Sequence, residues 1–161
     1  MRVLCCLDGT NAAQIAKATE MLAVAQPRAI AILHVIDTGP RRDMDRIRDR
    51  FFRSKARHLP HEEEMLETEK KSAQEILDAG RGYLADAETI EREGRPEREI
   101  VNVAAEWNAD LVLICSRAVY GGKVAIGPRS VGHVARFVLD HAPCPVFLVR
   151  PLAREQFPIS R

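Results

Sequence analysis

The segment from Leu111 to His133 combines residue types that can hold a negatively charged group. The apolar run Leu111–Cys115 is typical of a strand buried on both faces, and Ser130 is expected to open an amphipathic helix. Three glycines lie between them, Gly121, Gly122 and Gly127. Because the first backbone N–H groups of a helix attract anions, we predict that this loop is the functional site and that it binds a phosphate or another anion.

Two further side chains support this prediction, since Arg129 and His133 lie beside Ser130 at the expected helix start. Arg129 is positively charged, and the imidazole of His133 can gain a proton near neutral pH. Each residue also has a simpler explanation: Ser130 as a helix N-cap, Arg129 as a solvated side chain, and His133 as an exposed helix residue. Capping and phosphate binding are compatible, so both roles of Ser130 stay open.

Two other nucleotide-binding patterns are incomplete. The stretch from Gly80 to Ala85 fits G-x-G-x-x-A, but it follows a helix instead of a strand, so we expect it to be a helix end. Gly121-Gly-Lys123 resembles a P-loop, yet Arg117 replaces its leading glycine and Val124 replaces the Ser or Thr that binds magnesium. The sequence therefore argues against Walker-type hydrolysis.

The four cysteines, at positions 5, 6, 115 and 144, form no C-x-x-C pair, so neither a zinc site nor a disulfide framework is expected. Cys5 and Cys6 are adjacent in a predicted strand and point to opposite faces, which prevents them from gripping one metal ion. We expect them to be small buried apolar residues, and we expect no metal in this protein.

Composition indicates one globular domain. The chain has 161 residues, 46% of them hydrophobic, and a net charge of +1, which gives no strong field for nucleic acid or membrane. The first strand is expected from Arg2 with no signal-like leader, and no apolar run approaches the roughly 20 residues that span a bilayer. Together with the unpaired cysteines, this predicts a cytoplasmic protein.

Strand-like and helix-like segments alternate along the chain. Helical apolar spacing is expected between successive strands, with Pro96 at one helix start. Five strands interleaved with four helices predict a parallel sheet with right-handed crossovers. The predicted strands are Val3–Leu7, Ala29–Ile36, Ala87–Arg92, Asp110–Cys115 and Val146–Val149.

A basic segment, Arg41–Arg57, is inserted before the second helix. It holds eight basic and three acidic residues, with Met44, Ile47 and Phe51 at helical spacing, and the acidic run Glu62–Glu64 follows it. The segment is expected to be an amphipathic insertion at about 40–60. It is interpreted either as a solvated helix packed on its own domain or as a partner-docking or lid helix.

Several stretches together resemble the universal stress protein family: Val3-Leu-Cys-Cys-Leu-Asp-Gly-Thr10, His34-Val-Ile36, Gly94-Arg-Pro96, Ala109 to Arg117, and His141 to Arg150. The resemblance implies an α/β, Rossmann-like, three-layer sandwich of the adenine nucleotide alpha hydrolase-like type, with a five-stranded parallel sheet in order 3-2-1-4-5. It also implies a homodimer joined through the strand at 146–149. In such a sheet, ligands bind beyond the carboxyl ends of strands one and four.

The resemblance implies ligand-contacting positions in this sequence. Asp8, with Gly9 and Thr10 in its turn, would lie near an adenosine ribose or adenine, or Asp8 would only bond its own turn. The backbone at Val35 would meet the base edge, and the phosphates would be bordered by Cys115, Arg117, Ser130 and Val131. The family's nucleotide loop is G-x2-G-x9-G-[S/T], and this sequence has Cys115, Ala118 and Arg129 where the three glycines belong.

The prediction is thus a single domain over 1–151 with a tail at 152–161, acting as a cytoplasmic regulatory module that senses ATP, AMP or another phosphorylated ligand. A protein partner would respond when the ligand shifts the population of loop conformations. Two alternatives stay open. One is a homodimeric structural protein with an empty cleft; the other is a weak nucleotide hydrolase in which Asp8 or His133 assists water.

Overall fold

The computed structural model describes residues 1–22, 29–39, 60–116 and 130–150. The predicted basic insertion at 41–57 and the predicted tail at 152–161 lie outside these ranges.

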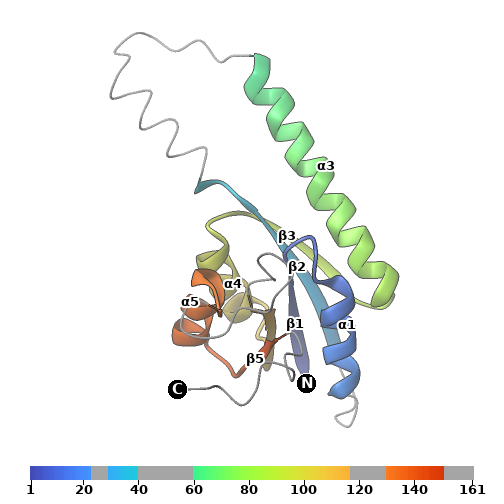
Figure 1. Cartoon of the computed structure of the whole chain (residues 1–161), viewed down its shortest axis with the longest axis vertical. Coiled ribbons are helices and arrows are strands. Elements are labelled where there is room, and N and C mark those ends of the chain that lie inside the picture. The colour runs from blue at the N-terminus through green and yellow to red at the C-terminus, as the bar shows by residue number, and fades with distance from the viewer. Residues whose placement is uncertain (23–28, 40–59, 117–129, 151–161) are drawn as a thin grey trace, which may run out of the picture.

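A five-stranded, all-parallel sheet forms the centre of the protein (Figure 1). Its order is β3-β2-β1-β4-β5, so the predicted fold class and strand order are confirmed. The first strand, β1, lies in the middle of the sheet and pairs in parallel with β2 and with β4. The register places Cys5 of β1 beside Ile32 of β2 and Leu113 of β4. The strands are β1 (Arg2–Leu7), β2 (Ala29–Asp37), β3 (Glu88–Gly94), β4 (Leu111–Cys115) and β5 (Val146–Val149).

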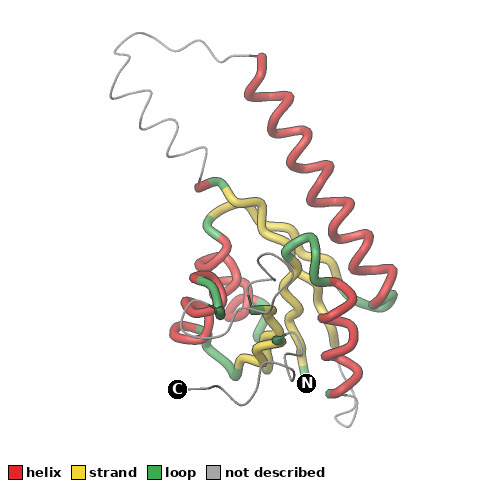
Figure 2. The backbone as a smooth tube through the Cα atoms, viewed as in Figure 1, coloured by secondary structure: helices red, strands yellow, loops and turns green. Residues whose placement is uncertain are grey.

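Helices cover both faces of the sheet, which gives three layers (Figure 2). On one face lie α1 (Ala12–Met21) and α3 (Pro60–Tyr83), and on the other lie α4 (Pro96–Glu106) and α5 (His133–His141). Pro96 occupies the first turn of α4, as expected, because its fixed φ suits a helix start and its missing N–H is not needed there.

The core is divided between the two faces because side chains alternate along each strand. Val3 and Cys5 of β1 pack under α1 and α3, whereas Leu4 and Cys6 pack under α4 and α5. The two cysteines therefore face opposite layers, as predicted. Full burial of a side chain such as Val3 or Leu4 contributes about 1.5–3 kcal/mol to the free energy of unfolding, so both layers stabilise the sheet.

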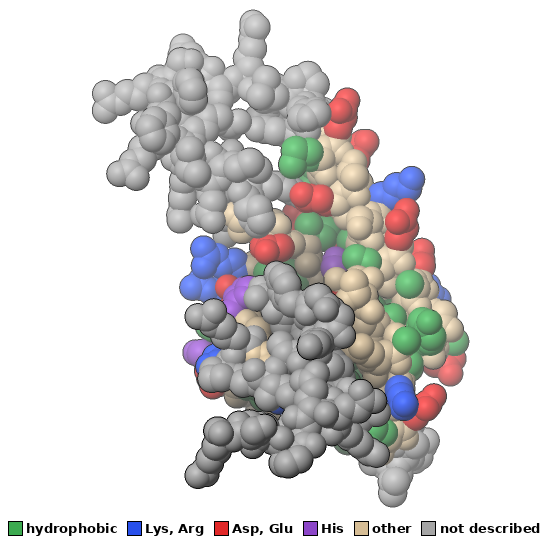
Figure 3. Space-filling model, viewed as in Figure 1, with side chains coloured by type: hydrophobic (Ala, Val, Ile, Leu, Met, Phe, Trp, Pro, Cys, Tyr) green, Lys and Arg blue, Asp and Glu red, His purple; other side chains and the backbone are tan. Residues whose placement is uncertain are grey.

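Helix α3 begins at Pro60 and is 24 residues long. Its first half is rich in glutamate, lysine and other good helix formers, and it extends past the end of the sheet in Figure 1. Acidic and basic side chains are interspersed along this helix (Figure 3). Farther along, Gly80 lets α3 approach the sheet, since a Cβ there would lie 2.6 Å from Leu7 Cδ1.

Candidate functional site

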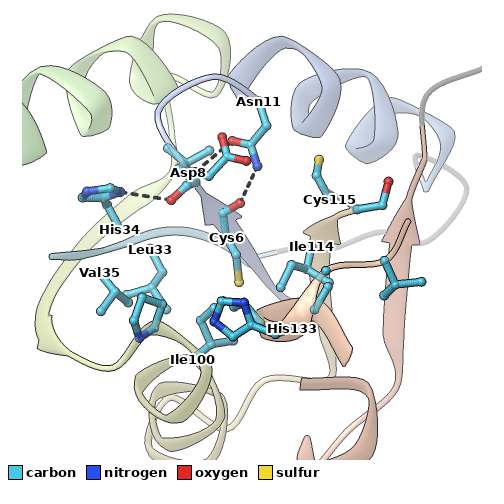
Figure 4. A pocket seen from close by; sticks show the side chains of 17 residues that line it. Cys6, Asp8, Asn11, Leu33, His34, Val35, Ile100, Ile114, Cys115 and His133 are labelled. Carbon is cyan, nitrogen blue, oxygen red and sulfur yellow. Dashed lines mark hydrogen bonds between the residues drawn. The ribbon is translucent and has the colours of Figure 1, made fainter. Parts of the chain in front are cut away.

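A cavity of about 340 Å³ opens at the carboxyl ends of β1, β2 and β4, where the winding of the sheet reverses (Figure 4). Its wall combines apolar side chains from the strands and α4 with polar groups at the strand ends and the start of α5. The lining residues are Cys6, Leu7, Asp8, Asn11, Leu33, His34, Val35, Pro96, Ile100, Ile114, Cys115, Ser116 and Val131–Ala135.

Asp8 directly follows β1 and forms a closed turn. Its Oδ1 atom accepts hydrogen bonds from the backbone N–H and the hydroxyl of Thr10, each at 2.9 Å, and Gly9 takes the positive φ of 93° that this turn needs. Within the described chain, the other carboxylate oxygen, Oδ2, accepts no hydrogen bond. Asp8 is exposed and lines the cavity, so it combines a turn function with an acceptor open to a ligand. Gly9 and Thr10 are not among the described lining residues.

Asn11 connects three elements around the cavity, although it is absent from the predicted site residues. It is 4% exposed; its Oδ1 accepts a hydrogen bond from the Asp8 N–H at 3.1 Å, and its Nδ2 donates to the Cys6 carbonyl at 3.0 Å. It also lowers the pKa of the Cys115 thiol, against the larger effect of burial. The position of an Asn just before an amphipathic helix indicates an N-cap, but this side chain points back to the strands instead (Figure 4).

β2 contributes two adjacent residues to the wall. Val35, a predicted contact for the base edge, is buried and lines the cavity. His34 Nδ1 lies 3.0 Å from the Leu7 carbonyl, and because a carbonyl can only accept, Nδ1 carries the proton in this contact. His34 is absent from the predicted site residues. The signal that could have identified it is its position next to Val35 in the His34-Val-Ile36 stretch.

At the end of β4, Cys115 lines the cavity with a neutral thiol. Burial raises the pKa of Cys115 to about 11, with a further rise from the Asp8 carboxylate and an opposing effect from the Asn11 hydrogen bond. A reactive cysteine needs a thiolate near neutral pH, so Cys115 lacks the electrostatic setting of a nucleophile. The next residue, Ser116, is buried, and its backbone N–H donates to the Val149 carbonyl at 2.9 Å.

The start of α5 differs from the prediction. Ser130 is not the N-cap, because α5 begins at His133 and Gly132 occupies the N-cap with φ 81° and ψ 160°. This conformation is available almost only to glycine and lies outside the helical region, so it delays the helix. Ser130 is 2% exposed, and its Oγ accepts a hydrogen bond from Arg150 Nη2 at 2.8 Å.

The backbone turn after Ser130 brings the helix start to the cavity. Val131, Gly132 and His133 all line it, and the His133 side chain is exposed. Ser130 itself is buried and is not among the described lining residues. Five predicted site residues lie outside the described residues: Arg117, Gly121, Gly122, Gly127 and Arg129.

The cavity therefore has an apolar floor and a polar rim. Leu33, Val35, Ile100 and Ile114 offer a surface for a flat ring, while hydrogen-bonding groups surround it at the strand ends and the start of α5. Such a combination is typical of sites for small organic molecules with polar substituents. Within the described ranges, no group of three or more His, Cys, Asp or Glu side chains could hold a metal ion, and no helix is long and apolar enough to cross a membrane.

Comparison with known proteins gives one consistent result. A family model described as "Universal stress protein family" matches residues 1–150. The chain is similar to Universal stress protein YxiE of Bacillus subtilis (strain 168), with 28% identity over 159 residues that cover 92% of this chain and 98% of that protein.

Solved structures share the fold. Universal stress protein UspA from Lactobacillus plantarum has a TM-score of 0.64 and 23% identity, with 93% of this chain and 97% of that chain covered. A universal stress protein family protein from Arabidopsis thaliana, solved with AMP bound, has a TM-score of 0.57 and 15% identity, with 99% and 97% covered. At these identities, the likeness shows the architecture.

Proposed function

The chain belongs to the universal stress protein family, since the family model covers residues 1–150, and from this premise we propose that it is a binding module for an adenine nucleotide such as AMP or ATP. The observation that carries the proposal is the cavity at the switch point of the sheet, which joins an apolar floor beside Val35 to a polar rim at Asp8 and α5. Its volume of about 340 Å³ lies in the range of small-ligand sites, roughly 300–1,000 Å³. The relative from Arabidopsis thaliana that was solved with AMP supports the same choice.

In this proposal, the adenine ring lies against the apolar floor with its edge at the Val35 backbone. Asp8 accepts hydrogen bonds from ribose hydroxyls through Oδ2, because Oδ1 is already engaged by Thr10. The phosphate lies toward Val131, Gly132 and the free N–H groups at the start of α5. The predicted residues of the connecting segment, Arg117 to Arg129, would complete its surroundings.

The module is further proposed to be a cytoplasmic homodimer joined through β5. This strand forms one edge of the sheet, and all four of its residues, Val146–Val149, are apolar and only half-buried. An apolar edge strand of this kind is normally covered or paired, and a second copy of the same strand is the simplest cover.

Thermal-shift titration with AMP, ADP, ATP and adenosine, each with and without magnesium, tests the proposal. A ligand at a hundred times its Kd stabilises the folded state by about 2.7 kcal/mol, which raises the Tm of a domain of this size by roughly 5–10 °C. Guanosine monophosphate is the matched control, because it keeps the ribose and phosphate and changes only the base.

The alternatives give different results in the same experiment. Absence of any shift with all four adenine compounds would favour a structural protein with an empty cleft and would overturn the binding proposal. Repeated turnover of ATP to ADP would favour the hydrolase instead. The raised pKa of Cys115 and the engagement of Asp8 Oδ1 by Thr10 both support binding without chemistry.

A further inference from the structure

Val149, the last residue of β5, and Arg150, which follows it, contact both flanks of the connecting segment between β4 and α5. On one flank, the Ser116 N–H donates to the Val149 carbonyl at 2.9 Å. On the other, the Ser130 hydroxyl accepts from the Arg150 guanidinium at 2.8 Å. The end of the edge strand and the residue after it thus contact the positions at which the chain leaves β4 and returns to the cavity.

Arg150 suits this task for chemical reasons. Its guanidinium stays charged at every physiological pH, and its planar fork fixes the direction of the bonds that it donates. The distance of 2.8 Å is typical of a charge-assisted hydrogen bond. The acceptor, Ser130, is 2% exposed, so its hydroxyl cannot exchange this partner for bulk water without opening the structure.

The position of Ser130 determines the geometry of the cavity rim. Val131, Gly132 and His133 follow it directly, and all three line the cavity. Because Gly132 takes a conformation that allows a sharp change of direction, an anchor is needed immediately before it to set where the free N–H groups of α5 point. Arg150 supplies that anchor from outside the cavity, since it is not among the described lining residues.

We propose that Arg150 is a positioning residue for the phosphate end of the site: it holds Ser130 so that the Val131–His133 turn and the start of α5 face the ligand, and it adds a positive charge behind them. This inference rests on the proposed nucleotide binding and adds to it a preference for phosphorylated over unphosphorylated ligands. It also links the residue that follows β5 to the residue that precedes the Val131–His133 turn.

The test compares AMP with adenosine, which lacks only the phosphate. Wild-type protein, Arg150→Gln, Ser130→Ala and the double variant are titrated with both compounds by calorimetry. Arg150→Gln is expected to weaken AMP binding about tenfold or more and to leave adenosine binding within about twofold, as the loss of a hydrogen bond to a charged group implies. The double variant should be no weaker than either single variant, because both remove the same contact.

Two controls separate positioning from general damage. Arg81→Gln removes the same charge from the exposed end of α3 and should leave both affinities unchanged. Arg150→Lys keeps the charge and a donor, and is expected to recover at least half of the lost AMP binding energy, measured as the logarithm of Kd. Hydrogen exchange of the Val131–Ala135 amides should rise in Arg150→Gln without any ligand, which reports on the anchor even if that variant binds poorly.

Specific results would overturn the inference. Unchanged AMP affinity in Arg150→Gln, an equal loss for adenosine and AMP, or multiplicative losses in the double variant would each remove the positioning role. Failure of the proposed function looks different: wild-type protein would then bind neither AMP nor adenosine, and the inference would fall with it.

Discussion

The Oδ1 atom of Asp8 accepts hydrogen bonds from both the N–H and the hydroxyl of Thr10 at 2.9 Å, so one carboxylate oxygen closes the turn after β1, and the same residue lines the cavity. Asp37 forms a similar turn at the end of β2, where its Oδ1 accepts from the Gly39 N–H at 2.8 Å, yet Asp37 does not line the described cavity. The two aspartates differ in their access to a ligand, and they therefore form a matched pair.

Asp8→Asn is expected to weaken adenosine and AMP binding about tenfold, because the amide keeps the turn acceptor but replaces the free carboxylate oxygen with a donor. The Tm should stay within about 2 °C of wild type, since Asp8 is exposed and its turn is preserved. Calorimetry and thermal unfolding measure the two quantities. Asp37→Asn should change neither, and equal effects of the two substitutions would contradict a ligand role for Asp8.

Asn11→Ala is expected to lower the free energy of unfolding by about 2–3 kcal/mol, because the Asp8 N–H and the buried Cys6 carbonyl both lose their partner. Urea denaturation measures this change. Asn102→Ala is the control, since Asn102 is exposed on α4 and its side chain makes a weak hydrogen bond of 3.5 Å to Glu99, and its effect should lie within about 0.5 kcal/mol. A similar small effect at Asn11 would show that water replaces its bonds.

Sequence patterns predict the strands well because burial on both faces leaves continuous apolar runs such as Leu111–Cys115. Sequence patterns predict the site residues poorly where tertiary contacts determine the position of a side chain. Asn11 and His34 reach the site only through bonds to strand-end carbonyls, and no local spacing reports such bonds. The polar half of α3 has no apolar stripe to reveal it, although Pro60 and the following glutamates are typical of a helix start.

Gly132→Ala is expected to destabilise the protein by about 1–3 kcal/mol, because φ 81° with ψ 160° is strained for any residue with a Cβ. It should also weaken AMP binding, since the turn into α5 forms part of the cavity wall. Gly82→Ala provides a control of opposite sign: no atom of the described residues lies within 4 Å of an added Cβ there, so alanine in α3 should stabilise by about 0.5–1 kcal/mol. Destabilisation of equal size at both glycines would contradict the conformational argument.

We expect the buried cysteines to make the protein less stable at alkaline pH. Burial raises the pKa of Cys5 to about 12 and that of Cys115 to about 11, above the value of 9.0 for a free thiol. Between about pH 8.5 and 11 the unfolded chain therefore loses thiol protons that the folded chain keeps, and the free energy of unfolding falls as pH rises. Below about pH 8.5 the two thiols are protonated in both the folded and the unfolded chain, so their full contribution to the free energy of unfolding is retained.

Urea midpoints at pH 8 and pH 10.5 measure this effect. Tyrosines and lysines also titrate in this range, so the informative quantity is the difference in slope between wild-type protein and Cys115→Ser. The variant should lose less stability between the two pH values, because one raised thiol pKa has been removed. Identical slopes would mean that the Cys115 thiol ionises as readily in the folded protein as in the unfolded chain.

Phe147→Lys is expected to convert the proposed dimer into a monomer. β5 ends the sheet, and its four apolar residues are half-buried, so a charge on this strand would have to be desolvated in a symmetric pairing of two edges. Light scattering after size-exclusion chromatography measures the mass, which should fall by half. Tyr83→Lys is the control, since Tyr83 is also a large apolar side chain, 60% exposed, but it lies at the end of α3 over the opposite half of the sheet. A wild-type monomer that Phe147→Lys leaves unchanged would mean that another surface or a different partner covers β5.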